Sequence, residues 1–214
     1  CQNFNHVILC VPAQKDTIWL ECTSQTQAFG YLSDFTEDRY VLLLTPDGGK
    51  ITRTPLYKPS DNRQFRNLKV KMEDSGDALV DVTTEYSGVQ QDSRSNVIHQ
   101  LGAKDQKEWL YKKIRIPSFE INTFEFKEKK DRVPVVNEKL SLLVRQYGSK
   151  SGNRMFINPN LLTTWTTALA NAQKRKNDIE LQMGFIDTDT VEISIPTEFK
   201  FEHTPSPIKI ETKF

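Results

Sequence analysis

The stretch that decides the fold is NLKVKMEDSGDALVDVTTEY, residues 67–86. Apolar and polar side chains alternate over 67–73 and again over 78–86. Alternation with a period of two places one face of a strand on a core and the other in water, so both segments predict half-buried strands. Asp74-Ser75-Gly76-Asp77 between them has the composition of a tight turn. These residues therefore predict an antiparallel hairpin.

Most of the remaining chain also has the composition of strands. We expect them at 4–11, 17–22, 40–45, 50–54, 120–127, 139–147, 154–157, 178–185, 190–195 and 209–214. Residues 104–114 predict a helix, while 88–101 are irregular or helical and 161–172 are a short helix or a loop. The length of the chain and the strand spacing favour a mainly β fold, an antiparallel β-sandwich with one short helix.

A polar stretch without periodicity, residues 58–66, is interpreted as a linker. Before it, residues 1–57 contain two hairpins, the second with its turn at Pro46-Asp47-Gly48-Gly49. After it, residues 67–214 are expected to form the β-sandwich. Because the chain begins and ends within expected strands, we expect it to be a fragment of a longer protein.

The composition argues against several classes of function. With 29 Lys and Arg against 28 Asp and Glu, the formal net charge is +1, which argues against a nucleic-acid or anionic-membrane surface. No apolar run approaches the roughly 18 residues that a membrane span needs. Apolar residues make up 37% of the chain and charged residues 27%, and with a mean hydropathy of −0.56 they indicate a globular, soluble chain rather than a disordered one.

The first two expected strands carry a candidate pair of catalytic groups, His6 and Glu21. A neutral imidazole accepts a proton near pH 7, and a carboxylate at its other ring nitrogen fixes the tautomer and stabilises the imidazolium. The pair is two thirds of a Cys-His-acid triad. Asp16 is a rival acid, but its place after Gln14-Lys15 favours a turn residue.

The residues around this pair resemble a known family. FNHVILCVPAQKDTIWLECTSQTQAFGY (4–31) and FTEDRYVLLLTPDGGKITRTPLY (35–57) are similar to the end of the transglutaminase-like domain in multidomain cell-envelope proteins of Gram-negative bacteria. These proteins are often labelled transglutaminase-like cysteine proteases. EYSGVQQDSR (85–94) and residues 189–214 look like the β-rich domain that follows the catalytic domain in that family.

The resemblance implies papain-like acyl-transfer chemistry. His6 matches the family's base, and Glu21 stands where the family usually has Asp. The family's nucleophilic Cys lies on a helix well upstream, so the resemblance implies that this chain is inactive alone and that its partner is the upstream catalytic portion of the parent protein. It also implies a peptide or protein substrate and a periplasmic or envelope location. We expect no cofactor and no metal.

The cysteines are interpreted as structural. Cys1, Cys10 and Cys22 are an odd set, and their spacing suits neither a zinc site nor an obvious disulfide. We expect free thiols, with Cys10 and Cys22 packed inward, and none of them as the nucleophile.

The remaining polar and aromatic candidates have structural interpretations too. His99 and His203 lack ligand spacing and are expected on the surface rather than on a metal. The mixed charges of 127–132 predict a solvated loop, and Trp109 and Trp165 are expected in the core. A second hypothesis stays open, in which the chain is a non-catalytic binding or structural module of an envelope protein.

Overall fold

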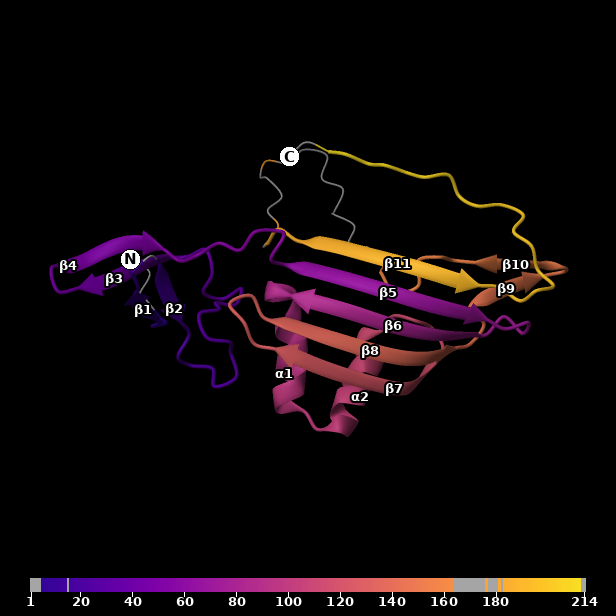
Figure 1. The fold of residues 1–214 in the computed structure, drawn as a ribbon, viewed down its shortest axis with the longest axis horizontal. Helices are drawn as coiled ribbons and strands as arrows, with labels where there is room; N and C mark the ends of the chain where they lie inside the picture. The colour runs from indigo at the N-terminus through magenta and orange to yellow at the C-terminus, as the bar shows by residue number, and fades with distance from the viewer. Residues whose placement is uncertain (1–4, 15, 164–175, 177–180, 182, 213–214) are drawn as a thin grey trace.

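The computed structural model describes residues 5–14, 16–163, 176, 181 and 183–212. Over these residues the chain is mainly β with antiparallel pairing, which confirms the predicted fold class. Figure 1 shows small hairpins at one end of the molecule and a large sheet with two helices across one face at the other. The candidate pair, His6 and Glu21, belongs to the hairpin end.

The hairpin end contains two antiparallel strand pairs. β1 (Leu9–Pro12) pairs with β2 (Thr17–Leu20), and β3 (Tyr40–Thr45) pairs with β4 (Gly48–Arg53). The second turn, Pro46-Asp47, lies within the predicted 46–49, and β4 begins at Gly48. The first strand is shorter than the predicted 4–11, because residues 5–8 run into β1 without pairing.

The large sheet has the strand order β11-β5-β6-β8-β7. Its strands are β5 (Arg63–Met72), β6 (Ala78–Ser87), β7 (Phe119–Lys129), β8 (Val135–Val144) and β11 (Ile186–Ser194). The hairpin predicted over 67–86 is β5 and β6, with Leu68 opposite Val82. β11 differs from the other strands because it runs parallel to its neighbour β5.

One face of the large sheet carries the core, and helices cover it. The 3₁₀ turn η1 (Gly88–Gln91) leads into α1 (Asp92–Gln100), and α2 (Ala103–Lys113) follows. Leu110 of α2 is buried against this face together with residues of β5, β6 and β8. The predicted helix 104–114 is therefore confirmed, and 88–101 is largely helical.

The second layer differs from that of a simple β-sandwich. Among the described residues, it consists of α1, α2 and the small hairpin of β9 (Gly148–Ser151) and β10 (Arg154–Ile157). Met155 and Ile157 of β10 pack against the core. Helices thus take the place of much of the second sheet.

Several predicted boundaries differ from the observed ones. The linker predicted at 58–66 overlaps β5, because Gln64 and Arg66 alternate onto the buried face. The charge run 127–132 begins inside β7, and residues 209–212 belong to no strand.

Other predictions lie partly or wholly outside the described residues. They are Cys1, Trp165, most of 161–172, much of 178–185 and the last two residues of 209–214.

Candidate functional site

The structure brings His6 and Glu21 together. Nε2 of His6 lies 2.8 Å from Oε2 of Glu21. His6 comes shortly before β1 and Glu21 directly after β2, and Leu9 lies opposite Leu20 in the antiparallel pair. The hairpin therefore places both residues at the same end, although neither belongs to a strand.

The carboxylate of Glu21 is held through its other oxygen as well. Oε1 accepts hydrogen bonds from the backbone N–H of Thr23 at 3.0 Å and from the Thr23 hydroxyl at 2.7 Å. Burial raises the pKa of Glu21, but the hydrogen bonds from His6 and Thr23 outweigh burial and hold this pKa below its ordinary value. Glu21 is therefore an ionised acceptor at neutral pH.

The imidazole of His6 is oriented by Glu21 and by an aromatic ring. The rings of His6 and Phe35 meet edge to face, with centroids 5.0 Å apart. The His6 side chain is 22% exposed, against 6% for Glu21. Because an ionised carboxylate only accepts hydrogen bonds, Nε2 carries the proton in the neutral imidazole. Nδ1 is then the free basic nitrogen at a partly open site.

The thiols do not complete a triad within the described residues. Neither Cys10 nor Cys22 is hydrogen-bonded to His6 there, and the Cys22 thiol instead contacts the carbonyl of Leu20 at 3.6 Å. Both are free thiols, but the prediction that they pack inward is wrong: Cys22 is exposed and Cys10 half-buried. The β1–β2 pair is a two-stranded ribbon, which cannot bury both of its faces. Cys1 lies outside the described residues.

Asp16 is a turn residue, as predicted. Its Oδ1 accepts from the backbone N–H of Thr17 at 2.7 Å, and its Oδ2 lies 2.6 Å from Nη1 of Arg132. The contact with Arg132, followed by the bond from Thr17, holds the pKa of Asp16 below its ordinary value. Arg132 ends the charge run 127–132, so that run contacts the N-terminal hairpin.

His99 forms a second His–Glu pair with the same separation. Its Nε2 lies 2.8 Å from Oε2 of Glu128 on β7. Like Glu21, Glu128 also accepts from a hydroxyl, that of Ser95 at 2.5 Å, but it has in addition a cation, Nζ of Lys130, at 4.0 Å. His99 is exposed, as predicted, and this pair joins α1 to the edge strand of the sheet.

The other two predictions for single side chains agree with the structure. His203 is exposed, and Trp109 packs against the core. Among the described residues, no three His, Cys, Asp or Glu side chains are grouped closely enough to hold a metal ion.

Sequence reasoning missed a polar cluster between the N-terminal segment and α1. The hydroxyl of Tyr31, which is 2% exposed, donates to Oδ1 of Asp92 at 2.9 Å, and Nε2 of Gln91 donates to the same oxygen at 2.6 Å. Burial raises the pKa of Asp92 to about 7, and the charges of Asp34 and Glu37 add to this effect. No local signal links Tyr31 to Asp92, because 61 positions separate them.

A second missed cluster lies on the core face of the large sheet. The hydroxyl of Tyr86 accepts from Arg66 at 3.2 Å and from Arg94 at 2.8 Å. It donates to Oε1 of Glu138 at 3.3 Å. Glu138 is 4% exposed, and its Oε2 lies 3.7 Å from Nε of Arg94. Alternation along β5 and β8 places Arg66 and Glu138 on the inward face, but charged side chains are typical of solvent-facing positions.

Residues 153–214 match a family described as a domain of unknown function with a solved structure, DUF3858. This segment contains β10 and β11, and it does not include His6 or Glu21. Searches of curated proteins and of solved structures found no match. None of the described helices is long and apolar enough to cross a membrane.

Proposed function

We propose that His6 is the general base of a thiol-dependent acyl-transfer reaction and that Glu21 orients it. The carrying observation is the 2.8 Å contact between Nε2 of His6 and Oε2 of Glu21. The thiol is proposed to come from a catalytic portion upstream of these residues in a longer parent protein. The parent would then be a cysteine peptidase or acyltransferase, acting on a peptide or protein in the bacterial cell envelope.

The proposed chemistry uses the free nitrogen of His6. Nδ1 takes the thiol proton, and the thiolate attacks the acyl carbonyl of the substrate. The imidazolium then returns the proton to the leaving amine, which leaves an acyl-thioester. Water completes hydrolysis, or a second amine accepts the acyl group. Throughout, the carboxylate of Glu21 stabilises the imidazolium, as the acid of a triad does.

Thr23 gives a physical reason why Glu can stand in place of Asp. A glutamate side chain has one more rotatable bond than an aspartate, so its carboxylate is less well fixed by the backbone alone. The two hydrogen bonds from Thr23 to Oε1 restrain that freedom and direct Oε2 at His6. Positioning of the acid is thereby shared between Glu21 and Thr23.

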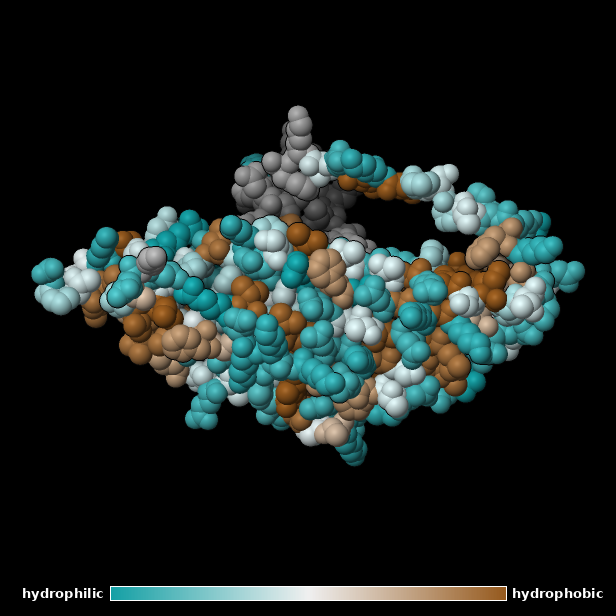
Figure 2. All heavy atoms as spheres, in the orientation of Figure 1, coloured by the Kyte–Doolittle hydropathy of each residue, from teal (hydrophilic) through white to brown (hydrophobic). Residues whose placement is uncertain are grey.

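The β3–β4 hairpin has an exposed apolar surface, which favours a role for this chain in supporting the catalytic portion of the parent protein. Tyr40, Leu42, Leu44 and Ile51 of the β3–β4 hairpin are exposed, and the register places Leu42 opposite Ile51. Figure 2 shows hydrophobic atoms on this end of the molecule. We propose that this surface contacts the catalytic portion. The alternative is that the chain is a non-catalytic binding or structural module.

The test uses the intact parent protein with iodoacetamide as a thiol probe and a peptidase or acyl-transfer assay. If His6 is the base, His6→Ala slows labelling of the nucleophilic thiol and lowers turnover about a hundredfold or more. His99→Ala is the matched control, since it removes a His–Glu pair of the same separation and is expected to leave both rates unchanged.

Two results would separate the hypotheses. A slow rate in His6→Ala and in Glu21→Ala, with His99→Ala normal, supports the catalytic proposal. A parent protein that is inert, and whose labelling is the same in all three variants, supports the non-catalytic module instead.

A further inference from the structure

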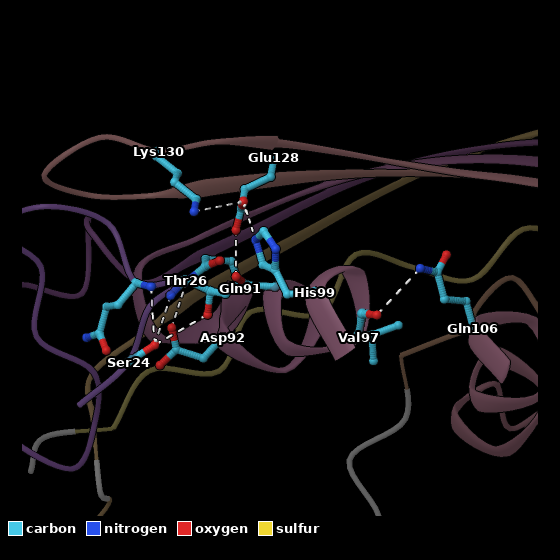
Figure 3. A network of polar contacts seen from close by, with 11 residues as sticks. Ser24, Thr26, Gln91, Asp92, Val97, His99, Gln106, Glu128 and Lys130 are labelled. Atoms are coloured by element: carbon cyan, nitrogen blue, oxygen red, sulfur yellow. Dashed lines mark hydrogen bonds and ion pairs between the residues drawn. The ribbon is translucent and has the colours of Figure 1, made fainter. Parts of the chain in front are cut away.

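A small pocket of about 160 Å³ lies where three distant segments of the chain meet. Its walls come from residues 24–34, from the beginning of α1 and from the end of β7 with Pro134. Figure 3 shows Ser24 and Thr26 beside Asp92 and Gln91, while Glu128 reaches from β7 towards His99. The proposed chemistry of His6 and Glu21 uses none of these wall residues.

The described residues that line the pocket include carboxylates but no Lys or Arg. The acids are Asp34, Asp92 and Glu128. Glu128 is compensated from outside by His99 at 2.8 Å and by Lys130 at 4.0 Å. Asp92 receives its hydrogen bonds from neutral groups only, the Tyr31 hydroxyl and the Gln91 amide. Above the raised pKa of Asp92, about 7, the pocket therefore carries negative charge that a cation would neutralise.

Gln91 adds an acceptor that lacks a donor. Its side chain lines the pocket and the residue is 3% exposed, yet Oε1 has no hydrogen-bond partner among the described residues. The amide nitrogen is already used, because it donates to Asp92 at 2.6 Å. A buried acceptor without a donor is unfavourable. Less than 1 Å² of Oε1 is accessible, so a ligand N–H gains from this position once the amide turns that oxygen towards the pocket.

We propose that this pocket binds a primary ammonium group, with Asp92 and Asp34 supplying charge and Oε1 of Gln91 accepting one of its hydrogen bonds. An ammonium group has three N–H donors on a compact charge, which suits acceptors on separate walls. A metal ion fits less well, because the acids are not grouped closely enough to chelate one. The hydroxyls of Ser24 and Ser95 add acceptors, and Ala28 and Pro134 face the carbon chain.

The size of the pocket sets the size of the probe. A volume of about 160 Å³ holds a few non-hydrogen atoms, given that a water molecule takes roughly 30 Å³ in the liquid. We therefore choose ethylammonium chloride, with ethanol as the neutral analogue and potassium chloride as the inorganic cation. A ligand of this size binds in the millimolar range at best. The titration is run at pH 8, above the pKa of about 7 to which burial raises Asp92.

Side-chain amide resonances of Gln91 report binding in a two-dimensional NMR titration. Ethylammonium is expected to give saturable shifts, and ethanol and potassium none at the same concentrations. Asp92→Asn and Asp34→Asn are each expected to weaken binding tenfold or more. Asp47→Asn, in the exposed β3–β4 turn, is the matched control and keeps wild-type affinity.

Other outcomes would overturn the proposal. They are the absence of saturable shifts with ethylammonium, equal shifts with ethanol or potassium, or unchanged affinity in Asp34→Asn. If Asp92→Asn does not fold, Asp34→Asn decides, because its side chain takes part in none of the Tyr31 and Gln91 bonds. These results are independent of whether His6 is a catalytic base.

Discussion

The hydroxyl of Tyr31 donates a hydrogen bond to the carboxylate of Asp92, and this bond ties the N-terminal segment to α1 across 61 positions of sequence. Tyr31→Phe removes the donor and keeps the ring. It leaves Asp92 in the same surroundings with one bond fewer, so we expect a loss of about 1–2 kcal/mol in the free energy of unfolding. Urea unfolding measures it.

Tyr40 provides the control for this substitution. It is 72% exposed, so Tyr40→Phe is expected to change the free energy of unfolding by less than about 0.5 kcal/mol. Equal stabilities of the two variants would show that the Tyr31–Asp92 bond does not tie the segments together.

Asp92 should also make stability depend on pH. Its folded-state pKa of about 7 lies above the ordinary 3.8, because burial and the acids Asp34 and Glu37 oppose its ionisation. At a pH between these two values, the carboxyl of Asp92 is ionised in the unfolded chain but keeps its proton in the folded chain. The folded state thus binds more protons, and stability falls as pH rises from about 4 to 7 and then levels off.

Asp92→Asn isolates this contribution, since an amide does not titrate and its oxygen can still accept from Tyr31. The free energy of unfolding of the wild type, minus that of the variant, is expected to decrease between pH 4 and pH 7. Urea titrations at several pH values measure both. Parallel pH profiles would contradict the raised pKa of Asp92.

Local patterns predicted the local parts of this fold. Alternation at 67–73 and 78–86 predicted β5 and β6, and Asp74-Ser75-Gly76-Asp77 predicted the turn between them. His6 and Glu21, predicted as a pair on neighbouring strands, flank the β1–β2 hairpin instead, and they meet at its end. In each of these cases the partners are close in sequence.

The parts that could not be predicted depend on partners far apart in sequence. β11 joins β5 in parallel through a crossover that no local signal marks. Arg66 seemed to belong to a polar linker, because its inward position is recognisable only once Tyr86 and Glu138 stand beside it. The same holds for Tyr31 and Asp92, whose contact depends on how the hairpins meet α1.

Gly76 occupies a position in the turn after β5 that a side chain cannot share. Its φ is +94°, and a Cβ there would lie 2.5 Å from the carbonyl oxygen of Gly148. Gly76→Ala is therefore expected to destabilise the chain by about 2–4 kcal/mol, from backbone strain together with the clash. Thermal or urea unfolding measures the change.

Gly152 separates the two causes. Its φ is +59°, but nothing lies within 4 Å of a Cβ there. Gly152→Ala is expected to cost only the strain, about 1–2 kcal/mol. If both substitutions lower the free energy of unfolding equally, the contact between residue 76 and the Gly148 carbonyl does not contribute to the loss.

Glu138 is expected to be critical for the polar cluster of the core. Glu138→Gln removes the negative charge that faces Arg94, whereas Arg66 keeps a second partner, Asp189, at 3.5 Å. The expected loss is about 3–5 kcal/mol. Glu125→Gln, in the exposed pair with Lys127 on β7, is the control and should leave the free energy of unfolding nearly unchanged.

A double variant tests whether charge is the cause. Glu138→Met with Arg94→Met removes both partners, and it is expected to recover part of the loss seen in Glu138→Gln. A double variant less stable than either single one would mean that the packing of these side chains, rather than their charge, is at stake.

The most direct test of the His6–Glu21 pair is the ring N–H proton of His6, observed by NMR on this chain near neutral pH. A hydrogen bond from Nε2 to the ionised Glu21 should slow its exchange with water, so that the proton gives a resolved signal on Nε2 while Nδ1 is unprotonated. Glu21→Ala should abolish the His6 signal and leave that of His99 intact. An His6 signal on Nδ1, or one unaffected by Glu21→Ala, would contradict the proposal that Glu21 orients His6.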